Sequence, residues 1–375
     1  MKNTAIYIHI PFCDHKCIYC DFYSLINYDY LKEYLDALKR EIIYYADRYS
    51  KDRIIDTIFF GGGTPSFMTP NYIGEIISTI NKNFILSKNA EITLETNPGT
   101  VEITKVKDFR NAGVNRISIG IQTFDEDELK FLTRIHNKKT AIDTVNNSFD
   151  AGFEKISIDL IFSLPNQTKE TWEENLEIAA GLPIKHISAY SLILEKGTIL
   201  NKMVLDGKVK MAEENHDAEL YEITMKYLTV KGFNQYEISN FAHPGFECKH
   251  NQYYWEYKDY LGFGTAAHSF VNGVRWWNYS SLKKYIHEIN LNQIAIRGKE
   301  NLTKDEMFEE FVMLGLRSKG INLDEINKYS SAWYFEKKKI INSFIEQRYL
   351  VEKNNYLSCT QKGYMICDEI INNLL

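Results

Sequence analysis

The sequence predicts an α/β protein built on a partial (β/α)6, TIM-like barrel, with a smaller C-terminal α+β domain that is helical and winged-helix-like. Two observations predict the barrel. From residue 5 to about residue 195, short apolar runs alternate with amphipathic helical patterns. Polar residues also recur at the carboxyl end of each apolar run, where parallel α/β barrels gather their ligands. The length of 375 residues leaves room for a second, smaller domain.

Six apolar runs are the strand candidates. Most are nearly continuous and rich in β-branched residues, as expected of a parallel sheet that is buried on both faces. We predict strands at Ala5–Ile10, Ile54–Phe60, Glu91–Thr96, Arg116–Ile121, Lys155–Phe162 and His186–Leu194.

Helical patterns lie between these runs. In Tyr30–Arg48, apolar residues repeat at steps of three and four, which places them on one face of a helix. Six βα units in a row indicate a barrel or an open doubly wound sheet, and the polar strand ends favour the barrel. The other helices are predicted at Asn71–Asn81, Ile103–Ala112, Thr140–Ala151 and Thr168–Ala180.

We divide the chain into three parts. Residues 1–235 form the barrel and end in a long helix at Met211–Lys231. Residues 236–298 form an aromatic connecting segment, and residues 299–375 form the C-terminal domain. In that domain a capping box, Thr303 with Glu306, opens a helix. Its predicted elements are helices at Lys304–Ser318 and Glu336–Arg348, a hairpin at Tyr349–Ser358 turning at Asn354-Asn355, and a helix from Thr360.

Composition narrows the possible functions. A net charge of −6 gives no electrostatic footprint for nucleic acid. No apolar run is long enough to span a membrane, and peripheral membrane contact is left open. Thiols near the N-terminus favour a reducing compartment, so we expect the protein in the cytoplasm.

Three of the six cysteines, Cys13, Cys17 and Cys20, lie within eight residues directly after the first predicted strand. Thiolates hold iron–sulfur clusters, and a cubane [4Fe–4S] cluster takes one ligand per iron. Three cysteines therefore leave one iron open to a small molecule. The other three, Cys248, Cys359 and Cys367, stand apart and are expected to be ordinary buried residues.

Two other interpretations of the three cysteines are open. The first is a structural Cys₃His zinc site with His9 or His15 as the fourth ligand. Zinc modules usually place a second ligand pair further along the chain, and none follows here. The second is a disulfide framework, which an odd number of cysteines and the length of the chain disfavour.

The other predicted strands also end in polar or glycine-rich segments. The second ends in Gly61–Ser66, and the third and fifth carry the carboxylates Glu95 and Asp159. A buried carboxylate costs several kcal/mol unless it is paired, so two of them suggest a polar ligand in the barrel mouth. Alternatively, each carboxylate caps a loop or pairs with an arginine. Gln122 and Tyr190 occupy the fourth and sixth strand ends.

These motifs resemble those of the radical S-adenosylmethionine (SAM) enzymes. The wider match is to the branch that contains oxygen-independent coproporphyrinogen III oxidases and the heme chaperones called HemW. The resemblance covers nearly the whole chain. It rests on YIHIPFC, FFGGGTPS, ETNPG, RISIGIQTF, LTRIHN, IDLIFSLPNQT, AYSLILEKGT, EISNFA, HNQYYW and EEFVMLGLRSKGI, in one order and at compatible spacing.

The resemblance implies that Cys13, Cys17 and Cys20 hold a [4Fe–4S] cluster and that SAM chelates the fourth iron. The cofactors carry the hard chemistry, while the protein positions them and excludes water. Glycines suit the SAM-binding turn because a Cβ would block close approach. Positions that match the family's SAM or second-ligand contacts are Tyr7, Tyr19, Gly62, Gly63, Thr64, Glu95, Gln122, Arg134 and Asp159, with Tyr190 flanking the same pocket.

Two departures point to the heme chaperone branch. Phe22 stands where the oxidases carry a further cysteine. The oxidases also have an N-terminal extension before the cysteines, for which the position of Cys13 leaves no room. Both features count against the decarboxylation of coproporphyrinogen, which is retained as the alternative function. They leave open whether the protein is an enzyme.

The resemblance also covers an H-N-x-x-Y-W segment that begins at His250. Imidazole is a common axial ligand of heme iron, and aromatic side chains suit a porphyrin face. His250 is therefore the predicted heme residue, and His268 is the second candidate. The alternative is that a loop histidine simply packs against the open end of the barrel.

The leading hypothesis is a protein that binds the cluster, SAM and heme, and delivers heme to an apo-haemoprotein of the respiratory chain. An electron donor such as flavodoxin or ferredoxin would reduce the cluster. The alternatives are the SAM-dependent oxidase of porphyrin biosynthesis and, from another class, a zinc-stabilised binding module.

Overall fold

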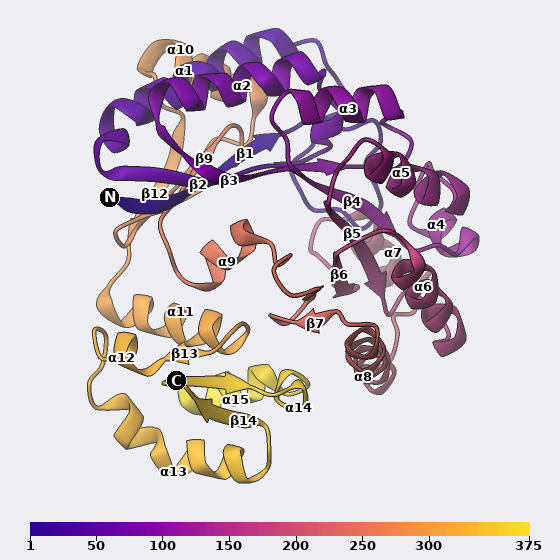
Figure 1. Cartoon of the computed structure of the whole chain (residues 1–375), viewed down its shortest axis with the longest axis vertical. Helices are drawn as coiled ribbons and strands as arrows, with labels where there is room; N and C mark the ends of the chain where they lie inside the picture. Colours follow the sequence, from indigo (N-terminus) through magenta and orange to yellow (C-terminus); the bar gives the residue numbers. More distant parts are fainter.

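The computed structural model describes all residues, 1–375. Six parallel strands form the centre of its main sheet, and each is hydrogen-bonded to the next in chain order (Figure 1). This confirms the predicted parallel α/β core. The strands are β1 (Lys2–Ile10), β2 (Arg53–Gly62), β3 (Ile85–Thr96), β4 (Arg116–Gln122), β5 (Lys155–Phe162) and β6 (His186–Ser191).

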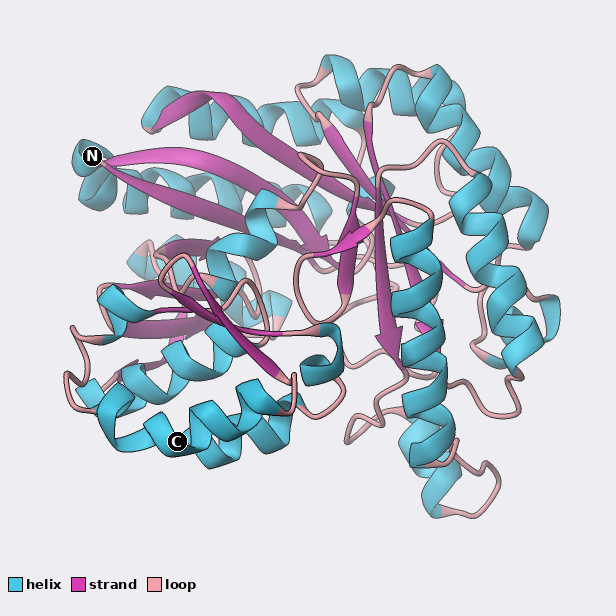
Figure 2. Ribbon diagram, turned by 60° about the horizontal axis from the view of Figure 1, so that its bottom comes forward, coloured by secondary structure: helices cyan, strands magenta, loops and turns pink.

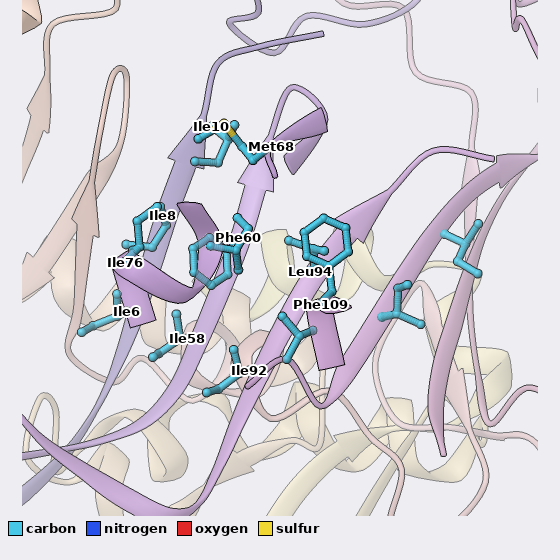
Figure 3. Packing of buried hydrophobic residues seen from close by; sticks show 14 of the residues in the cluster. Ile6, Ile8, Ile10, Ile58, Phe60, Met68, Ile76, Ile92, Leu94 and Phe109 are labelled. Carbon is cyan, nitrogen blue, oxygen red and sulfur yellow. The ribbon is translucent and has the colours of Figure 1, made fainter. Parts of the chain in front are cut away.

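Helices cover the outer face of this sheet, as Figures 1 and 2 show. Alternate strand residues pack against them, because successive side chains of a strand point to opposite faces. Figure 3 shows Ile6 and Ile8 of β1 packing in this layer with Ile58, Ile76 and Phe109. The helices are α1 (Leu31–Tyr49), α2 (Pro70–Asn83), α3 (Ile103–Asn111), α4 (Glu126–Phe131), α5 (Lys138–Asp150), α6 (Lys169–Gly181), α7 (Ile199–Leu205) and α8 (Glu214–Val230).

The predicted element positions agree closely with the structure. β5 has the predicted bounds, and most other predicted elements differ by one to three residues at an end, whereas the short helices α4 and α7 were not predicted. The largest difference is at β3, which begins at Ile85 rather than Glu91 because Ile85 and Leu86 pair with β2. The helix predicted to begin at Met211 begins at Glu214.

Residues 234–301, most of them predicted only as a connecting segment, extend the sheet at both edges. One pair of short strands follows β6, and four strands continue from β1, so the full sheet has twelve strands and does not close. Leu261, Phe263 and Tyr285 are buried in the same core as β1 and β2. The elements are β7 (Asn234–Gln235), β8 (Asn240–Ala242), α9 (Lys249–Trp255), β9 (Tyr260–Phe263), β10 (His268–Val271), β11 (Val274–Asn278), α10 (Leu282–Asn292) and β12 (Ile296–Asn301).

The C-terminal domain has its own core of 15 buried residues. The capping box is present: Thr303 N–H donates to Glu306 at 2.7 Å, and Glu306 N–H donates back at 3.2 Å. The hairpin turns at Asn354 and Asn355, both with positive φ. The elements are α11 (Lys304–Leu316), β13 (Ile321–Asn322), α12 (Leu323–Ile326), α13 (Trp333–Glu346), β14 (Leu350–Lys353), β15 (Tyr356–Cys359), α14 (Gln361–Tyr364) and α15 (Cys367–Leu374).

Helix α9 lies on the inner side of the sheet, between the strands and the C-terminal domain (Figure 1). It contacts β1 and β2 on one side and α11 on the other. The backbone of Ile238 also donates to Arg317 O at 2.9 Å, which ties the two domains together. No helix of the chain has the length and apolar character that a membrane crossing needs.

Candidate cluster and cofactor site

A cavity of about 550 Å³ lies on the inner side of the barrel and reaches the carboxyl ends of its strands. Its volume is typical of a small-molecule site. It brings together the residues predicted to hold the cluster, SAM and heme. They are Tyr7, Cys13, Cys17, Tyr19, Cys20, Gly62, Gly63, Thr64, Glu95, Gln122, Arg134, Asp159, Tyr190 and His250.

His268, the second heme candidate, lies elsewhere. It is on β10, outside the cavity, and its ring stacks on Trp277 with the ring centroids 5.7 Å apart. The structure thus does not bring His268 to the site.

The cysteine loop is fixed by backbone hydrogen bonds on two sides. Cys13 N–H donates to Leu25 O at 2.9 Å, so the loop returns alongside itself. Gly63 N–H donates to Ile10 O at 2.8 Å, and Thr64 N–H donates to Phe12 O at 2.7 Å. The turn after β2 therefore holds the start of the cysteine loop in place.

The glycines of this turn are needed for that contact. A Cβ on Gly63 would lie 2.6 Å from Phe12 O, and one on Gly62 would lie 2.7 Å from the His9 ring. Gly62 also has a φ of +111°, which side chains rarely adopt. The sequence suggested that glycine leaves space for a ligand. The structure adds that glycine leaves space for the cysteine loop.

A chain of hydrogen bonds joins two of the cysteines through three other side chains. Thr64 Oγ1 lies 3.2 Å from Cys13 Sγ and accepts from the amide of Asn97 at 2.8 Å. Arg134 Nη2 donates to Asn97 Oδ1 at 2.9 Å, and its Nη1 donates to Cys17 Sγ at 3.5 Å. Asn97 was missed by sequence reasoning, although it lies in the quoted motif ETNPG.

The two predicted carboxylates face the interior from β3 and β5. Gly62 N–H donates to Glu95 Oε2 at 3.2 Å, and Ser118 Oγ donates to Asp159 Oδ2 at 3.3 Å. Burial, with a smaller contribution from Asp159, raises the pKa of Glu95 to about 8. Burial raises the pKa of Asp159 to about 6. A cationic ligand in the cavity would therefore favour the ionised form of Glu95.

The polar interior of β4–β6 was only partly predicted. Ser118 and Ser157 are cross-strand neighbours, as are Ser157 and His186, and all three line the cavity. The sequence contains a signal for this polar face, because serine alternates with isoleucine in RISIGIQ and KISIDLIF. Arg116, also in the cavity wall, is held by Phe246 O at 2.9 Å and Glu91 at 3.6 Å.

The donor set fits a cluster better than a single metal ion. No group of three or more His, Cys, Asp or Glu side chains converges closely enough for one ion. Both ring nitrogens of His9 are already hydrogen-bonded, to Tyr7 and to Tyr23 O. His9 is therefore not free to serve as the fourth ligand of a Cys₃His zinc site. A cubane instead takes each thiolate on a separate iron.

Burial favours the protonated form of two thiols, those of Cys13 and Cys20. It raises the pKa of Cys20 to about 11 and also raises the pKa of Cys13. Metal ligation requires thiolates, so loading the site would release protons. The Arg134 guanidinium, 3.5 Å from Cys17 Sγ, would stabilise the resulting negative charge.

His250 lies near the start of α9 and lines the same cavity. Its side chain is 1% exposed and stacks on Phe59 with the ring centroids 4.9 Å apart. Thr57 Oγ1 lies 2.8 Å from its Nδ1, and Tyr254 Oη lies 3.0 Å from its Nε2. Both nitrogens are therefore engaged. Burial lowers the pKa of His250 to about 3, so the ring is neutral at physiological pH.

Two family models match parts of the chain. Residues 7–179 match the family model described as the radical SAM superfamily, and residues 302–366 match the HemN C-terminal domain. The chain is similar to the heme chaperone HemW of Bacillus subtilis, with 35% identity over 100% of this chain and 99% of that one. HemW of Lactococcus lactis is 34% identical, with 100% and 98% of the two chains covered.

A mitochondrial relative and a solved structure extend the comparison. The zebrafish (Danio rerio) radical S-adenosyl methionine domain-containing protein 1 is 34% identical, with 100% and 87% covered. Coproporphyrinogen III oxidase (HemN) of Escherichia coli superposes with a TM-score of 0.84 at 23% identity, over 99% and 89% of the two chains. That structure establishes a shared fold. The chain belongs to the radical SAM superfamily and, within it, to the HemW family.

Proposed function

We propose that this protein binds a [4Fe–4S] cluster, SAM and heme, and that it delivers heme to apo-haemoproteins. One observation carries the proposal: the HNxxYW helix α9 and the three-cysteine loop, more than 200 residues apart in sequence, line one cavity. Full-length similarity to proteins named heme chaperones supports the same function.

In this proposal, Cys13, Cys17 and Cys20 hold the cluster. Tyr7, Tyr19, Gly62, Gly63, Thr64, Glu95, Gln122, Arg134 and Asp159 form the SAM site, since all of them line the cavity beside the thiols. The reduced cluster would supply one electron for reductive chemistry on SAM. The residues of this chain would orient SAM and balance its charge, with Glu95 and Asp159 as the anionic partners.

Heme would bind at α9, and His250 is the residue of this helix on which the binding depends. The two bacterial relatives described above are named as heme chaperones. Phe22, which replaces the further cysteine of the oxidases, is 63% exposed and lines the cavity. We further propose a cytoplasmic protein that receives electrons from a flavodoxin or ferredoxin, loads a respiratory haemoprotein, and can touch the membrane surface where that recipient lies.

The test is a heme titration of the purified full-length protein and of the His250→Ala variant. We expect saturable uptake by the wild type and weaker uptake by the variant. Transfer is then followed by mixing the loaded protein with an apo-haemoprotein and measuring the recipient's activity. A wild-type protein that takes up no heme would contradict the proposal. Conversion of coproporphyrinogen III under reducing, anaerobic conditions would favour the oxidase alternative.

A further inference from the structure

The buried His250 and the partly buried Tyr254 form a pair on one face of α9. They lie four positions apart, which brings their side chains together on a helix. His250 Nε2 and Tyr254 Oη are 3.0 Å apart, and the two rings meet edge to face with centroids 5.1 Å apart. Histidine and tyrosine are both known axial ligands of heme iron. Either side chain could therefore bind the iron of an incoming heme.

The contact with Thr57 decides which nitrogen of His250 carries the proton. Thr57 is fully buried, and His250 Nδ1 is the partner of its hydroxyl at 2.8 Å. If Nδ1–H donated, the Thr57 O–H would have no acceptor, which is costly in a buried site. Thr57 therefore donates to Nδ1. The ring proton lies on Nε2 and is donated to Tyr254 Oη.

Accessibility separates the two side chains as well. The His250 ring is closed off by Thr57, Phe59 and Tyr254, with both nitrogens bonded and 1% of the residue exposed. Tyr254 is only partly buried and lines the cavity. Because the Tyr254 oxygen accepts from His250, its own O–H remains available for another partner. Tyr254 thus keeps an uncommitted O–H group in the cavity wall, whereas both nitrogens of His250 are engaged.

We propose that Tyr254 Oη is the protein atom that binds the iron of an incoming ferric heme, with His250 as the positioning residue that donates to it. The inference rests on the proposed heme binding and refines the role of His250. In the exchange, a hydroxide-bearing ferric heme binds. The Tyr254 O–H bond breaks, the iron–oxygen bond forms, and the hydroxide leaves with the proton as water. The iron remains ferric.

This arrangement suits a carrier that must release its cargo. The His250 N–H donates to the phenolate form and stabilises it, since hydrogen bonds to a charged form favour that form. Protonation of Tyr254 Oη would break the iron–oxygen bond and restore the arrangement seen here. Thr57 fixes the imidazole orientation, as outer partners of metal ligands commonly do.

The experiment compares ferric heme bound to the full-length wild type with Tyr254→Phe, His250→Ala and Tyr253→Phe. Tyr253 is the matched control, because it neighbours Tyr254 on α9 but bonds Asp56 at 3.2 Å and lies outside the cavity. Resonance Raman spectra of protein with ring-deuterated tyrosine identify phenolate bound to iron. Iron and sulfide contents and thermal unfolding of the heme-free variants check that each one folds.

We expect isotope-sensitive phenolate bands in the wild type and in Y253F, and their loss in Y254F together with at least about tenfold weaker binding. H250A should keep the bands but bind heme more weakly. Wild-type spectra and affinity in Y254F would overturn the inference and leave the proposed function standing. The same holds if the wild type shows imidazole ligation that H250A removes. A wild type that binds no heme removes the proposed function itself.

Discussion

Arg134 donates a hydrogen bond from Nη1 to Cys17 Sγ over 3.5 Å, although the two residues are 117 positions apart. Its Nη2 is fixed by Asn97 Oδ1 at 2.9 Å and Gly120 O at 2.7 Å. The guanidinium is thus a rigidly held positive charge beside one of the three thiols. Charge and hydrogen bonds at the sulfurs are the main determinants of cluster potentials.

Replacing Arg134 with Met should therefore lower the midpoint potential of the cluster, by on the order of tens of millivolts. Loss of the positive charge disfavours the reduced, more negative cluster. An EPR-monitored redox titration measures the shift. Arg134→Lys keeps the positive charge but loses the paired N–H donors of the guanidinium. Its midpoint potential should therefore lie between those of the wild type and the Met variant. An unchanged potential in the Met variant would contradict a role of Arg134 at the cluster.

Alanine at Cys13, Cys17 or Cys20 should each reduce the bound iron and inorganic sulfide of the reconstituted protein to a small fraction of the wild-type content. Each thiolate is expected to hold a separate iron. Cys248→Ala is the matched control, because Cys248 lines the same cavity but lies outside the loop. Iron and sulfide analysis after anaerobic reconstitution measures the cluster content of each variant. Equal losses in the Cys248 variant would show that the assay reports folding rather than ligation.

Gly63→Ala should destabilise the metal-free protein by about 2 kcal/mol, as overpacking typically does. The new Cβ would lie 2.6 Å from Phe12 O and 3.0 Å from Ile10 O, both rigid backbone atoms. The cysteine loop should also shift, which would lower cluster incorporation. Gly181→Ala at the end of α6 is the control, since a Cβ there meets nothing within 4 Å. Urea unfolding that shows equal stability for both variants would refute the steric argument.

Glu95→Gln should change how the stability of the metal-free protein depends on pH. Burial raises the pKa of Glu95 to about 8 in the folded protein, above its ordinary value. The unfolded chain therefore loses its proton first, and the wild type loses stability from about pH 5 to about pH 8. Glutamine does not titrate. Each unit of this shift corresponds to about 1.4 kcal/mol, so the wild type should weaken relative to Glu95→Gln by several kcal/mol across this window.

Urea unfolding of both proteins at several pH values between 5 and 9 measures this difference. Other titrating groups, including the thiols, are common to the two proteins and cancel in the comparison. Parallel stability curves would mean that the folded protein does not hold Glu95 in its protonated form.

The parallel core was predictable because its signals are local. The alternation of apolar runs with helical periodicity gave β1–β6 and the longer covering helices, but not the short α4 and α7. The capping box of Thr303 and Glu306 gave the start of α11. The strands between residues 234 and 301 were not predicted. They are two to six residues long, and their place in the sheet depends on pairing with distant partners such as Ala5 with Tyr260.

The candidate site shows the same difference between local sequence signals and long-range contacts. Cysteine spacing and the motifs gave the identities of the residues that line the cavity. The motifs did not predict that Asn97 links Thr64 to Arg134, because that link exists only when the segments after β2, β3 and α4 meet. They also placed His250 in a heme segment without indicating that Thr57 and Tyr254 occupy both of its nitrogens.

The sequence alone determined the family, the order of the βα units and the types of side chain available for chemistry. These depend on residue type and on spacing along the chain. Only the tertiary structure decided which groups touch, which are buried and which carry a proton. Those properties depend on contacts between residues far apart in the sequence, such as Thr57 with His250, and on the loss of water around them.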